Sequence, residues 1–243
     1  MPPAPDSLGC VIVGAAFVPE TPLLIPELAQ GAGAELDGLR AACRTAIERV
    51  AGRAPKLVVL GAATPGPGRS HPAGSSGTLA GFGLALEVPL GAGAPGPVDL
   101  PPALTVGAWL VRHAVGGRAG TQAISIGAGT EFPAQDLAGV AGNGDTALVV
   151  VGDGTACRST AAPGYLDERA GDFDAQISAA LAAGNPDGLC LPVDLAAELL
   201  VGGVHVWAAA ARALAGRRYD AELLYHEAPY GVGYFVAAWT SGG

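Results

Sequence analysis

The chain has 243 residues, half of them hydrophobic, and its mean hydropathy is +0.38. This composition excludes an intrinsically disordered chain and supplies enough apolar side chains for a substantial core. The 13 Lys and Arg against 22 Asp and Glu give a net charge of −9, and Lys56 is the one lysine. An acidic chain without a run of basic residues lacks the positive surface that binds nucleic acid or an anionic membrane, so neither is expected as a partner.

The four cysteines are widely spaced and form no CxxC pair: Cys10, Cys43, Cys157 and Cys190. Zinc-ribbon and thioredoxin motifs are therefore not indicated, and reduced thiols in the cytoplasm are the simplest interpretation. The first residues lack the basic region of a signal peptide, and no apolar run approaches the roughly 20 residues that span a bilayer. The sequence predicts a soluble, cytoplasmic protein.

Continuous apolar runs and helical spacing predict the elements of the first half of the chain. In chain order these are a buried strand at 10–17, a helix over 36–50, a buried strand at 56–62, an irregular loop at 64–77, a short strand at 84–89, a helix over 99–116 and a buried strand at 121–128. The helix over 36–50 has apolar residues at steps of three and four, which mark one buried face.

The second half is predicted by the same signals. Its elements are a short helix around 133–141, a strand at 146–152, a loop at 152–164, a helix over 166–181, a long helix over 194–215 and two strands within 220–239 around a turn at 228–231. Asp194 is the expected N-cap of the long helix, and Gly216 its expected end.

Strands and helices alternate along the chain, and the strands are continuous apolar runs. This pattern predicts one α/β domain over 1–243, with a mostly parallel sheet and helices on both faces. In such sheets ligands bind beyond the carboxyl ends of the strands. The loops at 18–22, 63–80 and 152–164 each follow a strand, so we expect them to converge, with the turn at 226–230 beside them.

Those loops carry carboxylate and imidazole groups rather than phosphate-binding or serine-hydrolase motifs. Glu20, His71 and Glu227 have donor atoms that suit Fe(II), Mn or Zn. His226 and Glu227 alternate on a predicted strand and point to opposite faces, so at most one enters a given site. His226 is the alternative ligand, since imidazole suits more metals.

Four segments resemble the family of class III extradiol ring-cleavage dioxygenases. They are VIVGAAFVPETPLLIPEL at 11–28, KLVVLGAA at 56–63, VVVGDGTACRS at 149–159 and HEAPYGVGYFVAAW at 226–239. The resemblance covers nearly the whole chain. It implies an α/β fold and Fe(II) held by two His and one Glu, with a further His as acid and base during cleavage of a catechol ring.

This chain departs from the family pattern at two places. Glu20 stands where the first metal histidine is expected, while His71 and Glu227 match the other two ligands. The loop that would carry the acid–base histidine contains Asp153, Cys157 and Arg158 instead. Two carboxylates make a harder site, which favours Mn, Mg or non-redox chemistry, or no bound metal. A thiol replaces the missing base only with a lowered pKa. Arg158 would either lower that pKa or bind an anionic substrate directly.

Plainer structural roles compete with these assignments. Glu20 is equally suited to capping or ion pairing, His71 to a surface loop, and Cys157 to an inert buried position. The function expected from the resemblance is metal-dependent oxidative cleavage of a small aromatic diol. The metal would be held by Glu20, His71 and Glu227, with the catalytic candidates named above facing the substrate. The alternatives are an inactive scaffold that binds a small molecule or a protein, a second copy of the chain included, and a non-redox metal-dependent enzyme.

Overall fold

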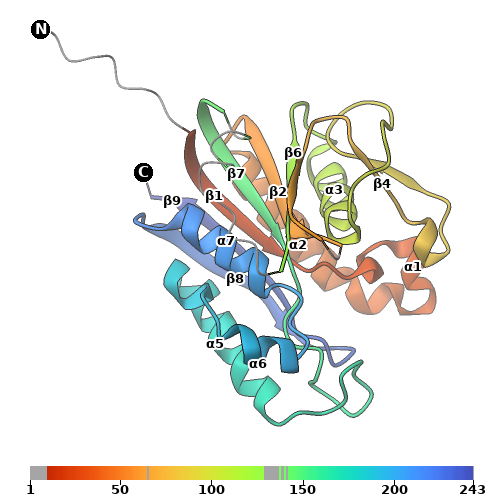
Figure 1. Ribbon diagram of the computed structural model, residues 1–243, viewed down its shortest axis with the longest axis vertical. Coiled ribbons are helices and arrows are strands. Elements are labelled where there is room, and N and C mark those ends of the chain that lie inside the picture. The colour runs from red at the N-terminus through yellow and green to blue at the C-terminus, as the bar shows by residue number, and fades with distance from the viewer. Residues whose placement is uncertain (1–9, 65, 129–136, 138–139, 141, 243) are drawn as a thin grey trace, which may run out of the picture.

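A seven-stranded sheet organises the fold in the computed structural model, which describes residues 10–64, 66–128, 137, 140 and 142–242 (Figure 1). Its strand order is β3-β6-β2-β7-β1-β9-β8. In chain order, the strands are β1 (Cys10–Val18), β2 (Lys56–Ala62), β3 (Arg69–His71), β6 (Gln122–Ile126), β7 (Gly144–Val151), β8 (Tyr219–Glu227) and β9 (Tyr234–Ser241). Two further strands, β4 (Ser76–Thr78) and β5 (Glu87–Pro89), pair as a small separate sheet.

The four central strands are parallel, as the sequence predicted. β1 and β2 both pair with β7, and β2 also pairs with β6. The antiparallel strands lie at the two edges, with β3 on β6 at one and the β8–β9 hairpin beside β1 at the other. Because β8 runs in the same direction as β1, the turn after it lies at the edge where the parallel strands end.

Helices cover both faces of this sheet, which confirms the expected α/β class (Figure 1). One face carries α1 (Pro26–Ala29), α2 (Asp37–Ala51) and α3 (Pro102–Val115); the other carries α5 (Arg169–Ala183), α6 (Val193–Glu198) and α7 (Val204–Leu214). Short 3₁₀ helices complete the fold: η1 (Pro22–Leu24), η2 (Gln30–Leu36), η3 (Ala80–Phe82) and η4 (Pro186–Leu189). Within the part of the chain that the structure describes, no helix combines the length and apolar character needed to cross a membrane.

Alternation along each strand builds two hydrophobic layers. In β2, Val58 and Leu60 face the layer beneath α7, while Leu57 and Val59 face the layer beneath α2 and α3. All four are at most 1% exposed. Because β2 is buried on both faces, its sequence is an unbroken run of apolar residues. The stripe of α2 that the spacing predicted is buried against the second layer.

Two predicted elements differ in the structure. The predicted irregular loop at 64–77 contains β3 and the start of β4, because its short polar segments pair with the edge of β6 and with β5. The predicted helix over 194–215 is broken into α6 and α7 by residues 199–203. Leu200 has a φ of 54° there, outside the helical range. Most of the short helix expected around 133–141 lies outside the described residues.

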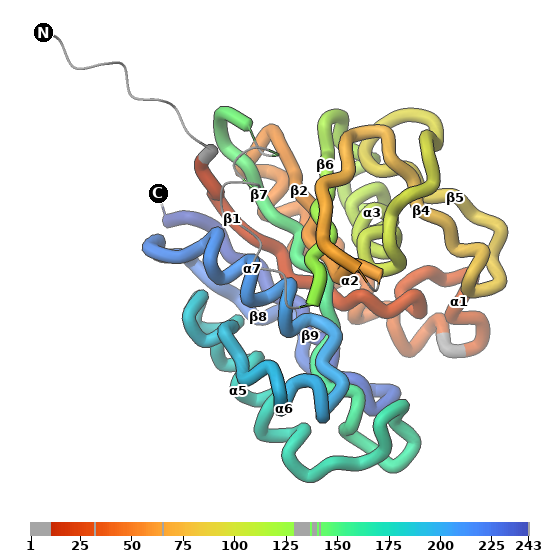
Figure 2. Tube along the Cα trace, viewed as in Figure 1, coloured from red at the N-terminus to blue at the C-terminus, as the bar shows by residue number. Residues whose placement is uncertain are grey.

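The segment after β7 lies against the turn between β8 and β9, at the carboxyl edge of the sheet (Figure 2). The backbone N–H of Gly154 donates to the carbonyl of Gly233 at 2.7 Å, and that of Gly233 donates to the carbonyl of Thr155 at 2.8 Å. A third bond runs from the N–H of Arg158 to the carbonyl of Gly231 at 3.0 Å. These bonds fix one wall of the edge where ligands are expected.

Candidate functional site

A cavity of about 540 Å³ lies at the carboxyl edge of the parallel strands. Its walls come from the segments after β1, β2 and β7, the start of α3, η3 and the β8–β9 turn. The lining residues are Glu20, Thr21, Pro22, Leu23, Ala62, Ala63, Thr64, Phe82, Pro102, Ala103, Asp153, Pro163, Tyr230, Val232 and Tyr234. The expected convergence of the loops after the strands is therefore present. The lining is mostly apolar with a few polar groups, as is usual for small-molecule sites.

Glu20 and Asp153 supply the charge of this cavity. They follow the adjacent parallel strands β1 and β7, and the backbone N–H of Glu20 donates to Oδ1 of Asp153 at 2.9 Å. The N–H of Gly152 in turn donates to the carbonyl of Val18 at 3.0 Å, which continues the strand pairing up to the site. The two carboxyl groups are thus held together by the register of the sheet.

Gly202 makes room for the Glu20 carboxyl group. A Cβ on Gly202 would overlap Oε1 of Glu20 and would lie 3.7 Å from the backbone nitrogen of Asp153. The N–H of Gly203 donates to the carbonyl of Asp153 at 2.8 Å, which holds the α6–α7 break against the end of β7. The broken helix therefore closes the site from the α7 face of the sheet.

Burial makes both carboxyl groups weaker acids. It raises the pKa of Glu20 to about 7, and it raises the pKa of Asp153 well above its ordinary value. The neighbouring Glu20 carboxylate raises the pKa of Asp153 further, whereas the N–H bond from Glu20 opposes this shift. Two adjacent carboxyl groups in an apolar cavity resist joint ionisation, so the pair retains a proton near neutral pH.

Hydroxyl groups stand around the pair. Tyr234 opens β9, is 2% exposed and hydrogen-bonds Thr21. Burial raises the pKa of Tyr234 to about 12, so its hydroxyl stays protonated. Tyr230, in the β8–β9 turn, donates its hydroxyl to Oε2 of Glu35 at 3.1 Å and so ties the turn to η2. In the sequence both tyrosines look like turn and packing residues; only the fold places them in the cavity lining.

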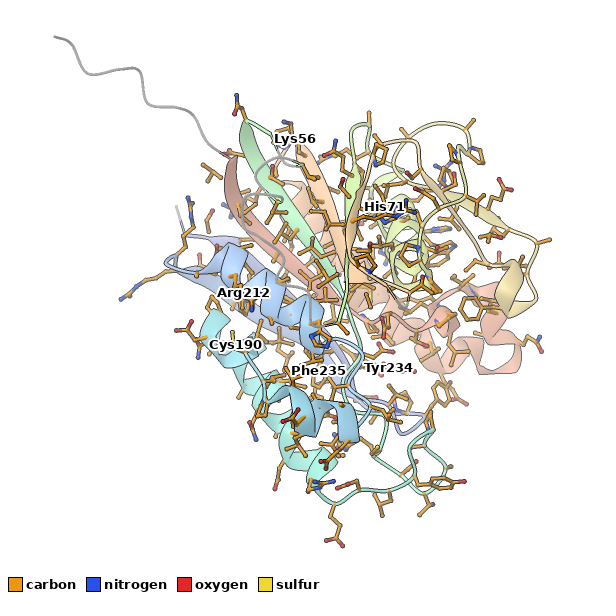
Figure 3. The ribbon with its side chains drawn as sticks, in the orientation of Figure 1. Lys56, His71, Cys190, Arg212, Tyr234 and Phe235 are labelled. Carbon is orange, nitrogen blue, oxygen red and sulfur yellow. The ribbon has the colours of Figure 1, made fainter. Side chains whose placement is uncertain are left out.

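His71 lies away from the cavity, on the edge strand β3. Figure 3 shows it in the upper half of the view, well separated from Tyr234 near the lower end of β9. The residue is 1% exposed, with Nε2 3.2 Å from the hydroxyl of Ser125 and Nδ1 3.4 Å from Oδ2 of Asp99. Burial lowers the pKa of His71. His71 is thus a buried residue of an edge strand rather than a surface residue. Because β3 is antiparallel to β6, the chain at His71 leads away from the carboxyl edge of the parallel strands.

Glu227 and its neighbour His226 point to opposite faces of β8, as the alternation predicted. Glu227 is exposed and accepts a hydrogen bond from the hydroxyl of Tyr225 at 3.1 Å. It pairs in register with Tyr234 but stays outside the cavity lining. His226 stacks on Phe235, with ring centroids 4.7 Å apart. Its pKa is lowered by burial.

Cys157 and Arg158 were expected to face the substrate, but neither residue lines the cavity. Cys157 is 2% exposed within the apolar layer under α5 and α7, and burial raises the pKa of its thiol rather than lowering it. Arg158 turns toward α5 and pairs with Oδ2 of Asp174 at 2.8 Å. Asp153 alone among the three expected catalytic residues lines the cavity. The reason is that the loop turns inward after Asp153 and pairs with the β8–β9 turn.

Asp174 is a polar residue that the sequence did not single out. It is fully buried on α5 and accepts from the backbone N–H and the hydroxyl of Thr155, at 3.0 and 3.1 Å, as well as from Arg158. A Cβ on Gly154 or Gly233 would collide with its carboxylate. The one available signal was an aspartate on the apolar face of a predicted helix, next to Phe173.

The residues that the resemblance assigned to a metal are not gathered at one place. Among the described residues, no group of three or more His, Cys, Asp or Glu is arranged to hold a metal ion. Glu20 lines the cavity, His71 bonds to Ser125 and Asp99, and Glu227 is exposed on the edge strand. This donor set does not fit one ion, so we derive no chemical step through a metal.

No protein-family model matches the chain, and no curated protein matches it. Among solved structures, the chain is similar to the uncharacterised protein JW3007 from Escherichia coli K12, with 13% sequence identity. The match covers 94% of this chain and 100% of that chain, with a TM-score of 0.47. A likeness at this level assigns neither a family nor a function to this chain.

Proposed function

We propose that this chain binds a small, largely apolar ring compound in the cavity at the carboxyl edge of its sheet. The Glu20–Asp153 pair holds a hydrogen-bond-donating group of that ligand. The observation that carries the proposal is the placement of two adjacent carboxyl groups at the end of β1 and β7, inside a cavity whose other walls are mostly apolar. Two carboxyl groups present several acceptor sites to a donor.

The apolar walls supply the rest of the affinity. Leu23, Phe82 and Val232 are among the side chains that a ring would cover, and about 25 cal/mol is gained for each Å² of apolar surface removed from water. A cavity of about 540 Å³ lies within the size range of small-molecule sites. Of the functions expected from the sequence, the small-molecule scaffold is the one this geometry favours. The reaction open to such a site is proton exchange with Glu20, whose pKa of about 7 suits an acid–base group.

Ring cleavage of a catechol-type substrate stays a prediction from the sequence resemblance. It requires a metal centre, and the three residues assigned to it lie apart. Iron or manganese retained by purified wild-type protein and lost in His71→Ala would support that function.

A cavity-filling variant tests the binding proposal. Thr64 lines the cavity at an exposed position, so Thr64→Trp places an indole ring in the cavity without replacing a buried core side chain. Thr160→Trp is the matched control at an exposed threonine outside the lining. Ligand-observed NMR with catechol and benzyl alcohol is expected to show binding to wild type and to Thr160→Trp, and its loss in Thr64→Trp. Absence of binding to wild type, or equal binding to all three proteins, would contradict the proposal.

We also propose a cytoplasmic location for the protein. Cys43, Cys157 and Cys190 are all free thiols, as a reducing compartment would leave them. A homo-oligomer stays a prediction whose test is the mass of the protein in solution.

A further inference from the structure

The charge of the cavity lining is one-sided. Glu20 and Asp153 are its charged residues, and no Lys, Arg or His occurs among the described residues that line it. Within the described chain, neither carboxyl group forms an ion pair; the arginine closest in sequence, Arg158, is committed to Asp174. The cavity thus holds a pair of acidic groups that no cation of the described protein compensates.

Buried carboxyl groups of this kind are costly without a partner. Removing a charged group from water carries a large penalty unless hydrogen bonds or an opposite charge offset it. Glu20 lies against Gly202 with most of its surface covered. Among the described residues, no donor forms a hydrogen bond with its side chain, and the hydrogen bond that Glu20 does form is donated by its backbone N–H. A cationic group entering the cavity would offset that cost for both carboxyl groups, whereas an anion would increase it.

The walls suit an organic cation. Tyr230, Tyr234 and Phe82 bring aromatic rings to the lining, and ring faces attract ammonium groups. Apart from Thr21 and Thr64, the remaining walls are apolar and fit the carbon skeleton of a ligand rather than the water shell of a metal ion. The net charge of −9 adds a long-range field that attracts cations and repels anions.

We infer that the ligand of this cavity is a protonated organic amine with a ring-shaped apolar body, its ammonium group held between the carboxyl groups of Glu20 and Asp153. The inference rests on the proposed binding function and names the chemical class of its ligand. A charge-assisted hydrogen bond is about twice as strong as a neutral one, so the ammonium group is the main source of selectivity.

Three probes of similar size and different charge test the inference: benzylamine, benzyl alcohol and benzoate. Titration calorimetry at pH 8 is expected to give benzylamine a Kd roughly tenfold or more below that of benzyl alcohol, with benzoate the weakest. The Glu20→Gln variant is expected to weaken benzylamine roughly tenfold and to change benzyl alcohol by less than about twofold. Glu27→Gln makes the same charge change at an exposed glutamate outside the cavity and is expected to leave all three unchanged.

The outcomes separate the two proposals. Benzyl alcohol binding as tightly as benzylamine would overturn the amine inference and leave the binding function standing. Failure of all three probes to bind would overturn both. Because the comparison of probes uses the wild-type protein, it stays decisive even where Glu20→Gln fails to fold.

Discussion

The carboxyl group of Glu20 makes the stability of the fold depend on pH. Burial raises its pKa from 4.5 to about 7, so the folded protein holds this proton more tightly than the unfolded chain. Its contribution is therefore fully present below about pH 4.5 and is lost as the pH rises to about 7. The expected loss is on the order of 3 kcal/mol, at 1.36 kcal/mol for each pKa unit.

Urea unfolding of wild type and Glu20→Gln between pH 4.5 and pH 8 measures this loss. The free energy of unfolding of wild type is expected to fall more steeply with pH than that of the variant. The other groups facing the pair, Cys43 of α2 and Tyr234 of β9, both have raised pKa values and stay protonated over this range. The raised pKa of Asp153 acts in the same direction. Equal slopes for the two proteins would show that Glu20 is not held as described.

Gly202 is expected to be a positioning residue for Glu20. In Gly202→Ala, the new Cβ overlaps Oε1 of Glu20. Overpacking of this kind costs about 1–3 kcal/mol, and displacement of the carboxyl group is expected to weaken benzylamine more than benzyl alcohol. Gly171→Ala on α5 is the matched control, since a Cβ there meets nothing within 4 Å and is expected to stabilise by about 0.5–1 kcal/mol. Unchanged benzylamine affinity in Gly202→Ala would contradict the positioning role.

Asp174 connects two elements, α5 and the segment after β7, and its loss is expected to destabilise that connection. Asp174→Asn removes the charge that pairs with Arg158 and turns an amide toward the donors of Thr155. Breaking a buried pair from one side costs about 3–5 kcal/mol, and the partial exposure of Arg158 places the expected value at the lower end. Asp172→Asn, at an exposed position of the same helix, is expected to change stability by less than about 0.5 kcal/mol. Denaturant midpoints measure both, and similar values for the two variants would refute the role of Asp174.

His71 stabilises the junction of β3 and β6 and is expected to be dispensable for ligand binding. His71→Ala removes buried contacts to Ser125 and Asp99, at a cost of about 1–3 kcal/mol in unfolding free energy. Benzyl alcohol affinity, measured well below the unfolding temperature, is expected to stay unchanged because His71 is outside the cavity lining. A large loss of affinity in the folded variant would place His71 at the site after all.

Elements with strong periodicity were more predictable from the sequence than elements fixed by tertiary contacts. The strand at 56–62 follows from its apolar run, and the end of α3 at Val115 follows from Gly116, which adopts a φ of 74° as the C-cap. β3 has three residues and no apolar pattern, so its pairing with β6 was not detectable locally. The break between α6 and α7 had a local signal, the pair Gly202 and Gly203, which the apolar spacing of the flanking residues outweighed.

At the scale of the whole molecule, parallel topology explains why half of the site was predictable. Glu20 and Asp153 both follow parallel strands, and such strands end at the same edge, so their proximity follows from the element order. The positions of Cys157 and Arg158 depend on how the loop turns after Asp153, and that path is set by bonds to Asp174 and the β8–β9 turn. Contacts between segments so distant in sequence leave no spacing pattern to detect.

A second cavity of about 410 Å³ lies on another surface, between α2 and α3, and is an alternative binding site for a ring compound. Arg40, Arg44 and His113 are among its lining residues. Arg40 pairs with Asp37 of the same lining, which leaves Arg44 without an oppositely charged partner among the described residues that line this cavity, so that cavity favours anions, whereas the carboxyl pair favours cations. The place where a cationic ring compound binds therefore distinguishes the two cavities.

Mapping of backbone amide shifts by ¹H–¹⁵N NMR during titration with benzylamine tests the proposed binding site most directly. We expect the shifts to centre on the cavity at the carboxyl edge, with Thr21, Asp153 and Val232 among the residues affected, and to diminish in Thr64→Trp. Shifts centred on Arg40 and His113, or no shifts at millimolar benzylamine, would contradict binding at the carboxyl pair.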